Sequence, residues 1–177
     1  LGFRALSQNT VCHGSIAIGY NALDANTTGH NHVAIGYESL KANTTGYYNT
    51  AIGFDTLKTN TTGIQNTAIG YRVLCANTIG NNNTAIGVGS MLSNTTGVNN
   101  IALGYQAGNN ITTGSGNVVI GNGDVASATG DKQLKISDGV DGSVAWITGD
   151  SSGNIGIKQT SPTAGLHIGG NGTDAGS

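Results

Sequence analysis

Small and hydrophobic residues recur along most of this chain at a constant interval of 17 residues. Each interval ends on a glycine, and the series runs without an insertion or deletion through Gly2, Gly19, Gly36, Gly53, Gly70, Gly87, Gly104 and Gly121. In most copies Ala-Ile precedes the glycine, an aromatic residue follows it, and Leu lies four positions beyond it. A fixed period is the signature of a solenoid, in which each repeat forms one coil that stacks on the next.

The length of the repeat favours strands over helices. A helical repeat needs roughly 33 to 47 residues, whereas this shorter one suits two strands of about five residues joined by tight turns. We expect one strand at the Ala-Ile segment and a second one just after the glycine, around residues 71–76 in one coil, with Leu74 pointing inward. The recurring Asn-Thr-Thr-Gly segments supply turns, because Asn and Thr bond to the local backbone and Gly accepts a positive φ.

The first strand of each coil separates large side chains from small ones. Thr67, Ile69 and Tyr71 alternate with Ala68 and Gly70, so the two sets lie on opposite faces. We expect Ile, Leu and aromatic columns to fill the coil. Because these columns make a narrow core for a single rod, we expect the flat Ala and Gly face to pack against other copies of the chain. The alternative is that Ala and Gly fill a tight turn.

Three segments carry a resemblance to a known family. Residues 15–19, 32–36 and 100–104 resemble the Asn/Ser-x-Ala-Ile-Gly repeats of trimeric autotransporter adhesin heads, and the resemblance covers about residues 1–122. It implies that the 17-residue coils of this all-β chain form a left-handed parallel β-roll solenoid, three copies of which associate side by side as a homotrimeric fibre. The coil is longer here than the usual repeat of those heads, and the extra residues fall in the Asn-Thr-Thr-Gly turn.

The period ends near residue 122, and residues 123–177 form a second region with a different composition. It contains six of the nine acidic residues and the single Trp, and we expect strands at 133–137, 143–148 and 154–157. Residues 153–168 are similar to a segment of bacteriophage tail fibres and related bacterial surface fibres, although Lys158 stands where that segment usually has Gly. We therefore expect a β-roll domain at 1–122, a small β-rich fibre segment at 123–177, and a chain that is a fragment of a longer fibre or a processed product.

Composition and charge exclude several classes of protein. Gly, Asn and Thr make up 73 of the 177 residues, charged residues only 9%, and the net charge is −2. The chain lacks the basic footprint of a nucleic-acid-binding protein, a long apolar run that would insert into a membrane, and the glycine spacing of collagen. Its order must come from repetition.

Acidic residues offer one candidate for catalysis. Glu38 and Asp55 fall in one column about 4.8 Å apart, a separation similar to that of a retaining glycosidase pair. We favour two solvated carboxylates beside Lys41 and Lys58. We find no nucleophile, phosphate-binding or dinucleotide motif, so we predict no enzyme activity and no cofactor.

Histidine and cysteine give no metal or disulfide signal. His32 stands in a column otherwise filled by Asn; a ring of His32 in a trimer could hold an ion, but we favour a substitution within a polar ladder. The chain lacks the Cys and His spacing of zinc sites, and we predict no metal site. Cys12 and Cys75 lie roughly 19 Å apart along the stack, too far for an intrachain disulfide.

The leading hypothesis for function is a structural trimeric fibre protein, a tail fibre or a surface adhesin, that displays a receptor-binding surface. Its partners would be its own copies and a cell-surface glycan or protein receptor, and it would lie outside the cell, on a virion or a bacterial surface. Candidate binding residues are Trp146, Asp138, Asp141 and Asp150 in the second region. For Trp146 we favour the alternative of plain core packing.

Two other functions stay open. The Thr column at Thr27, Thr44, Thr61, Thr78 and Thr95 could order water as in an ice-binding solenoid, although these residues fall in a turn. A polysaccharide-degrading fibre enzyme is the third possibility, and the few acidic residues of the repeats argue against it.

Overall fold

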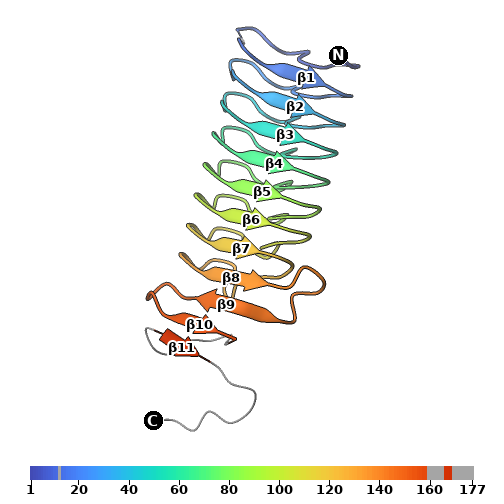
Figure 1. Ribbon diagram of the computed structural model, residues 1–177. Helices are drawn as coiled ribbons and strands as arrows, with labels where there is room; N and C mark the ends of the chain where they lie inside the picture. Colours follow the sequence, from blue (N-terminus) through green and yellow to red (C-terminus); the bar gives the residue numbers. More distant parts are fainter. Residues whose placement is uncertain (12, 159–165, 169–177) are drawn as a thin grey trace.

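The chain forms a stack of coils whose described strands all belong to one sheet (Figure 1). The computed structural model describes residues 1–11, 13–158 and 166–168, and none of these residues is helical; no described segment could therefore cross a membrane as a helix. The strands follow the chain order: β1 (Ile16–Ile18), β2 (Val33–Ile35), β3 (Thr50–Ile52), β4 (Thr67–Ile69), β5 (Thr84–Ile86), β6 (Ile101–Leu103), β7 (Val118–Ile120), β8 (Leu134–Ser137), β9 (Ala145–Gly149), β10 (Ile155–Ile157) and β11 (Leu166–Ile168). The prediction of an all-β solenoid is confirmed.

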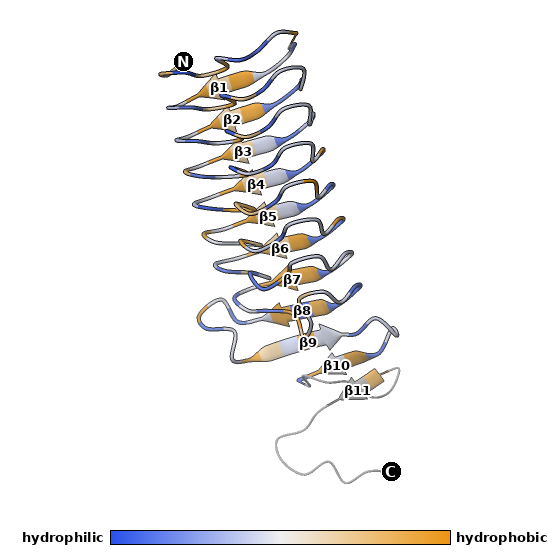
Figure 2. Ribbon diagram, turned by 180° about the vertical axis from the view of Figure 1, so that it is seen from behind, coloured by the Kyte–Doolittle hydropathy of each residue, from blue (hydrophilic) through white to orange (hydrophobic). Residues whose placement is uncertain are grey.

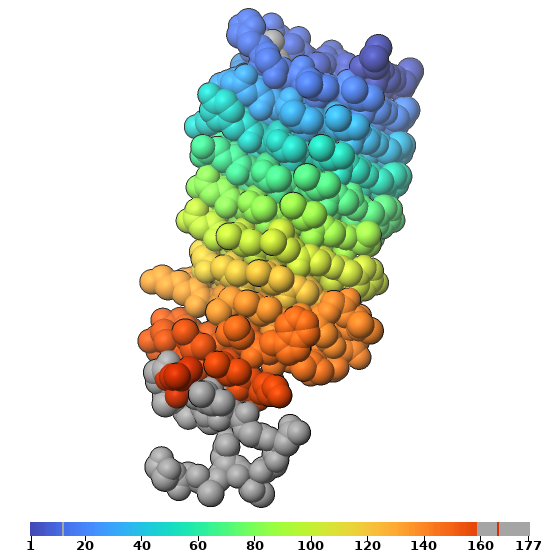
Figure 3. Space-filling model, in the orientation of Figure 1, coloured from blue at the N-terminus to red at the C-terminus, as the bar shows by residue number. Residues whose placement is uncertain are grey.

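Strands β1 to β8 are parallel, and each belongs to one coil. The register keeps the 17-residue interval from Ala17 opposite Ala34 onward, and shortens by one residue at the last step, where Val119 lies opposite Lys135. Strand β9 then runs antiparallel to both β8 and β10, and β11 is parallel to β10. Figure 3 shows the coils as close-packed layers, with the C-terminal strands at the end of the stack.

Each coil contains one strand rather than the two that we expected. Residues 71–76, where the second strand is expected, form a series of bends and turns. Arg72 and Leu74 have φ values of 54° and 48°, and an extended strand cannot contain such left-handed residues. Leu74 nevertheless points inward and is buried, as expected, and its N–H donates to the carbonyl of Ser90 in the next coil at 3.1 Å.

Alanine, and not isoleucine, faces the inside of the coil. The central Ala of strands β1 to β6 is at most 8% exposed, whereas the residues on either side of it are partly or largely exposed. Our expectation of an outward Ala face and an inward Ile and aromatic core was therefore wrong. The Leu of the left-handed turn already occupies the narrow interior, so only a small side chain fits beside it. Figure 2 shows the hydrophobic residues of β1, β2, β6 and β7 along the strand stack.

The glycines that recur every 17 residues are required by the close spacing of the coils. Gly36 has a φ of 135°, and a Cβ added to it would lie 2.3 Å from the carbonyl oxygen of Gly53. A side chain at this position would therefore collide with the backbone of the next coil. This contact explains why the glycine recurs in every coil.

Asparagine columns fill the rest of the interior. In the first column each side-chain amide donates to the Oδ1 atom of the preceding Asn at 2.8–3.0 Å, through Asn26, Asn43, Asn60, Asn77 and Asn94. In the second column the Oδ1 of each Asn accepts from the backbone N–H of the next at 2.9–3.0 Å, through Asn49, Asn66, Asn83, Asn100 and Asn117. An amide suits such a ladder because it carries both a donor and an acceptor, so identical residues satisfy one another.

One coil departs from the pattern by three coupled substitutions. Gly108 stands in the Leu column, Ile111 in the first Asn column and Val119 in the Ala column. A Cβ on Gly108 would lie 2.9 Å from Cδ1 of Ile111 and 3.3 Å from Cγ2 of Val119, so these two side chains fill the space that Leu fills elsewhere. The exchange has a cost: Oδ1 of Asn94 is buried without a hydrogen-bond partner among the described residues.

We predict that Gly108, Ile111 and Val119 can be replaced by the residues of the other coils only when all three are replaced together. Gly108→Leu alone should destabilise the protein by about 1–3 kcal/mol through overpacking, and Ile111→Asn alone by about 2–4 kcal/mol through loss of buried apolar volume. The triple variant Gly108→Leu, Ile111→Asn, Val119→Ala should unfold within about 1 kcal/mol of the parent, because it restores the Leu column and satisfies Asn94. Urea unfolding followed by circular dichroism measures this. A triple variant as unstable as the sum of its single variants would contradict the account.

Candidate functional site

The predicted binding residues lie in the C-terminal strands and loops, but they do not form one site. Trp146 is in β9 and its side chain is 51% exposed, so core packing was the wrong interpretation of this residue. Asp138 and Asp141 lie between β8 and β9, and Asp150 begins the connection from β9 to β10. Their role in binding stays a prediction.

Two of these carboxylates shape their own loops. Oδ1 of Asp141 accepts from the N–H of Ser143 at 2.9 Å, and Asp150 accepts from the N–H groups of Ser152 and Asn154 at 2.9 and 3.0 Å. Hydrogen bonds lower the pKa of both aspartates. The largest contribution comes from the Ser143 side chain for Asp141 and from the Asn154 side chain for Asp150, and the backbone N–H groups add to it. Both aspartates therefore have a structural role.

A polar hollow of about 510 Å³ lies where the repeats meet the C-terminal strands. It is lined by Gln106, Asn109, Asn122, Gly123, Asp124, Lys135, Val140, Asp141 and Gly142. A second hollow of about 300 Å³ shares Asp124 and Lys135 with it. Of the four predicted binding residues, only Asp141 lines the polar hollow, so reasoning from the sequence missed most of this site.

Lys135 owes its position to the register of the sheet. It lies opposite Val119 in the parallel pair of β7 and β8, at the end of the inward column that Ala fills in the earlier coils. Its Nζ lies over Gly123, because a Cβ on that glycine would be 2.7 Å away. Within the described residues Lys135 forms none of the ion pairs. The 17-residue period would place Ile136 in this column, and the shortened register places Lys135 there instead, so no signal in the sequence identified it.

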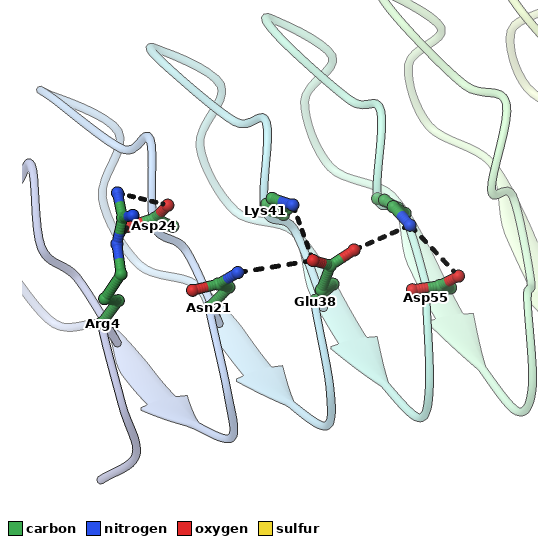
Figure 4. Close-up of polar contacts among 7 residues, drawn as sticks. Arg4, Asn21, Asp24, Glu38, Lys41 and Asp55 are labelled. Atoms are coloured by element: carbon green, nitrogen blue, oxygen red, sulfur yellow. Dashed lines mark hydrogen bonds and ion pairs between the residues drawn. The ribbon is translucent and has the colours of Figure 1, made fainter.

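Charged residues of the first coils form a ladder along one side of the stack (Figure 4). Glu38 is only 6% exposed, and its two carboxylate oxygens lie 2.6 Å from Nζ of Lys41 and 2.7 Å from Nζ of Lys58. Lys58 also lies 3.3 Å from Asp55. The prediction of solvated carboxylates was therefore wrong for Glu38, which is covered and doubly paired.

The ion pairs control the ionisation of Glu38. Burial alone would raise its pKa, but hydrogen bonds from Lys41, Lys58 and Asn21 lower the pKa to about 2. A catalytic acid of a glycosidase needs the opposite, a raised pKa that keeps its proton near neutral pH. The pair formed by Glu38 and Asp55 therefore does not fit that chemistry.

His32 replaces an asparagine in the second interior column. Its Nε2 lies 2.8 Å from the carbonyl oxygen of Gly46, and its Nδ1 accepts from the N–H of Asn49 at 3.3 Å. Because a carbonyl only accepts, the proton is on Nε2, and the neutral ring imitates an amide. Burial is the main cause of its lowered pKa. His32 is fully buried, which agrees with the polar-ladder interpretation, and no metal-binding cluster occurs among the residues that the structure describes.

The threonine column of the turns uses its hydroxyls within the chain. Each Oγ1 of Thr27, Thr44, Thr61 and Thr78 donates to the carbonyl of the matching Thr in the next coil, at 3.0–3.2 Å. These hydroxyls are therefore engaged in the ladder between coils. Of the two cysteines, Cys12 lies outside the described residues, and Cys75 is a half-buried thiol whose pKa burial raises.

The outward side of the strands forms what we call the outer apolar face. Its first two columns are the residues on either side of the central Ala in β1 to β6 and of Val119 in β7, mainly Ile, Val and Thr. Its third column borders them and consists of Phe3, Tyr20, Tyr37, Phe54, Tyr71, Val88 and Tyr105. The first five rings stack with centroids 4.9–5.4 Å apart, and all seven side chains are exposed.

Comparison with known proteins adds no relative. Neither protein-family models, nor curated proteins, nor solved structures gave a match to this chain. The function must therefore be inferred from the surfaces described above.

We predict that the ion pairs of Glu38 make stability depend on pH. Its pKa is lowered from 4.5 to about 2, so the stabilisation is complete above about pH 4.5 and is lost as the pH falls through 2. Glu38→Gln should reduce the free energy of unfolding by about 1–2 kcal/mol at pH 6, allowing for the partial exposure of the lysines. Unfolding at several pH values measures the difference, with Lys132→Met as the control. A constant difference between Glu38→Gln and the parent from pH 6 to pH 2 would refute this explanation.

Proposed function

We propose that this chain is a structural fibre protein that associates through its outer apolar face into a homotrimer. Its C-terminal region then serves as the surface for attachment to a cell. The observation that carries the proposal is the outer apolar face, in which a column of Ile, Val and Thr, a column of Ile and Leu and a column of mostly aromatic residues are all left partly or largely exposed in the single chain. Contiguous exposed apolar surface of this extent is rare in monomeric proteins and marks sites of association.

The geometry of the face favours side-by-side association. Seven repeat intervals of about 4.8 Å give a stripe roughly 34 Å long, parallel to the axis of the stack. The aromatic rings already stack on one another, so they are held in place before a partner arrives and lose little side-chain entropy on association. A second copy of the same periodic surface matches it in spacing. Association therefore runs along the whole length of the repeats.

Two resemblances in the sequence support the number of chains and the location. The Asn/Ser-x-Ala-Ile-Gly segments resemble those of trimeric autotransporter adhesin heads, which supports three chains. The C-terminal segment resembles bacteriophage tail fibres and bacterial surface fibres, which supports an extracellular location on a virion or a bacterial surface. The Ala face expected to make the contact is buried within each coil, and the opposite face of the same strands takes its place.

A structural role is also supported because the residues considered for catalysis and for ice binding are engaged in contacts within the chain. Glu38 and Asp55 share Lys58 in ion pairs, and the low pKa of Glu38 does not suit a catalytic acid. The threonine hydroxyls proposed for ice binding donate to neighbouring coils. Association of copies explains the exposed columns of the outer apolar face, which neither catalysis nor ice binding explains.

A matched pair of substitutions tests the association surface. Ile86 in the outer apolar face is 40% exposed, and Ile79 in the Asn-Thr-x-Gly turn is 51% exposed. Ile86→Asp should raise the concentration at which the trimer dissociates by about 100-fold or more, because it buries an unpaired charge in the interface three times. Ile79→Asp should leave the concentration unchanged. Sedimentation velocity over a dilution series measures both.

The controls separate association from folding. Circular dichroism should report the same β content for both variants, since each replaced side chain projects outward in the single chain. Equal effects of the two substitutions on the sedimentation coefficient would place the interface elsewhere. A parent protein that sediments as one chain at every concentration would remove the proposal.

A further inference from the structure

The geometry points to the polar hollow beside Lys135 as a binding site for a neutral saccharide. This inference rests on the proposed function in one respect, since it names the receptor chemistry that the fibre would contact. The site is concave, and its lining comes from four segments: the last coils of the repeat, the connection after β7, strand β8 and the β8–β9 loop. Such convergence of polar side chains in a hollow is typical of small-molecule sites.

The walls of the hollow are held in place by hydrogen bonds. Asn122 donates through its side-chain amide to the carbonyl of Val140 at 2.8 Å, and its N–H donates to the carbonyl of Asp138 at 2.8 Å. Asp124 accepts from the N–H of Asn110 at 3.0 Å. These bonds tie the β8–β9 loop and the connection after β7 to the repeat. The site therefore does not need to be ordered by its ligand, which lowers the cost of binding.

The chemistry of the lining selects the class of ligand. Gln106 and Asn109 offer amides that both donate and accept, and sugar hydroxyls also do both. One Lys and two Asp give a formal charge of +1 − 2 = −1, which disfavours an anionic sugar. An apolar ligand would strip water from these charged groups without replacing its hydrogen bonds. A neutral polyhydroxylated ligand avoids both costs.

Lys135 supplies the feature that a purely structural lining would not need. Lys135 lies in the inward column of the strands, opposite Val119. In the six coils that precede Val119 this column holds only Ala, whose small side chain fits the narrow interior. Lysine instead brings an ammonium group with three N–H donors, and among the described residues none of the ion pairs uses it. These donors are available to ligand hydroxyls.

The hollow stays accessible in the proposed assembly. None of its lining residues belongs to the three columns of the outer apolar face. Its repeat residues lie instead in the columns that carry Glu38 and Lys41 in an earlier coil. A homotrimer formed through the outer apolar face would therefore present three such hollows to solvent.

A glycan array probed with the fluorescently labelled protein tests the inference. We expect binding to one or more neutral glycans, weakened about tenfold or more by Lys135→Met, which keeps the length of the stem but removes the donors. Asp141→Asn should weaken the same binding, although the amide oxygen can still accept from Ser143. Lys132→Met is the control, because Lys132 is exposed and lies outside the lining, and it should bind as the parent does.

Three outcomes would overturn the site. They are an absence of binding to every neutral glycan, binding only to sialylated or uronic glycans, and neutral-glycan binding that survives both Lys135→Met and Asp141→Asn. Sedimentation of the same samples separates this result from the fibre proposal. A monomer that binds through Lys135 would contradict only the fibre, whereas a trimer that binds no neutral glycan would contradict only the saccharide site.

Discussion

Backbone hydrogen bonding from coil to coil is the constraint on which this structure depends. Because the register advances by 17 residues at each step from β1 to β7, every side chain lies beside the matching residue of the next coil. Only residues that tolerate their own copy can then repeat. Asn does so through its amide, Gly does so because the next carbonyl leaves no room for a Cβ, and His32 does so by adopting the donor and acceptor pattern of Asn.

The same constraint explains why hydrophobic side chains face outward. The coil has one short strand and a left-handed turn, and its interior is filled by Leu, Ala and Asn columns. The larger Ile and aromatic residues are excluded from this space and form the outer apolar face. A chain with so small an interior is stabilised mainly by contacts between neighbouring coils, and covering its outer face with copies of itself adds the apolar burial that a single rod lacks.

Much of the fold could be predicted from the sequence, and the errors have definite physical causes. The period identified the solenoid, the Ala-Ile segments located the strands, and the Asn column identified the setting of His32. Alternation along a strand defines two faces but does not say which is inside, so Ala68 and Ile69 were assigned the wrong way round. Leu74 has a positive φ, which a leucine in a sequence does not indicate. The turn that replaces the expected second strand could therefore not be predicted. The site was harder still, because Lys135 enters the hollow only through a register that shortens by one residue.

Small-angle X-ray scattering of the unaltered protein tests whether the outer apolar face joins chains side by side. It measures the mass and the length of the particle in the same sample. Side-by-side association of three chains should give a mass of three times 17.7 kDa with a repeat region about 34 Å long, no longer than that of one chain. A particle with the mass of one chain, or a heavier particle lengthened by end-to-end stacking, would contradict it.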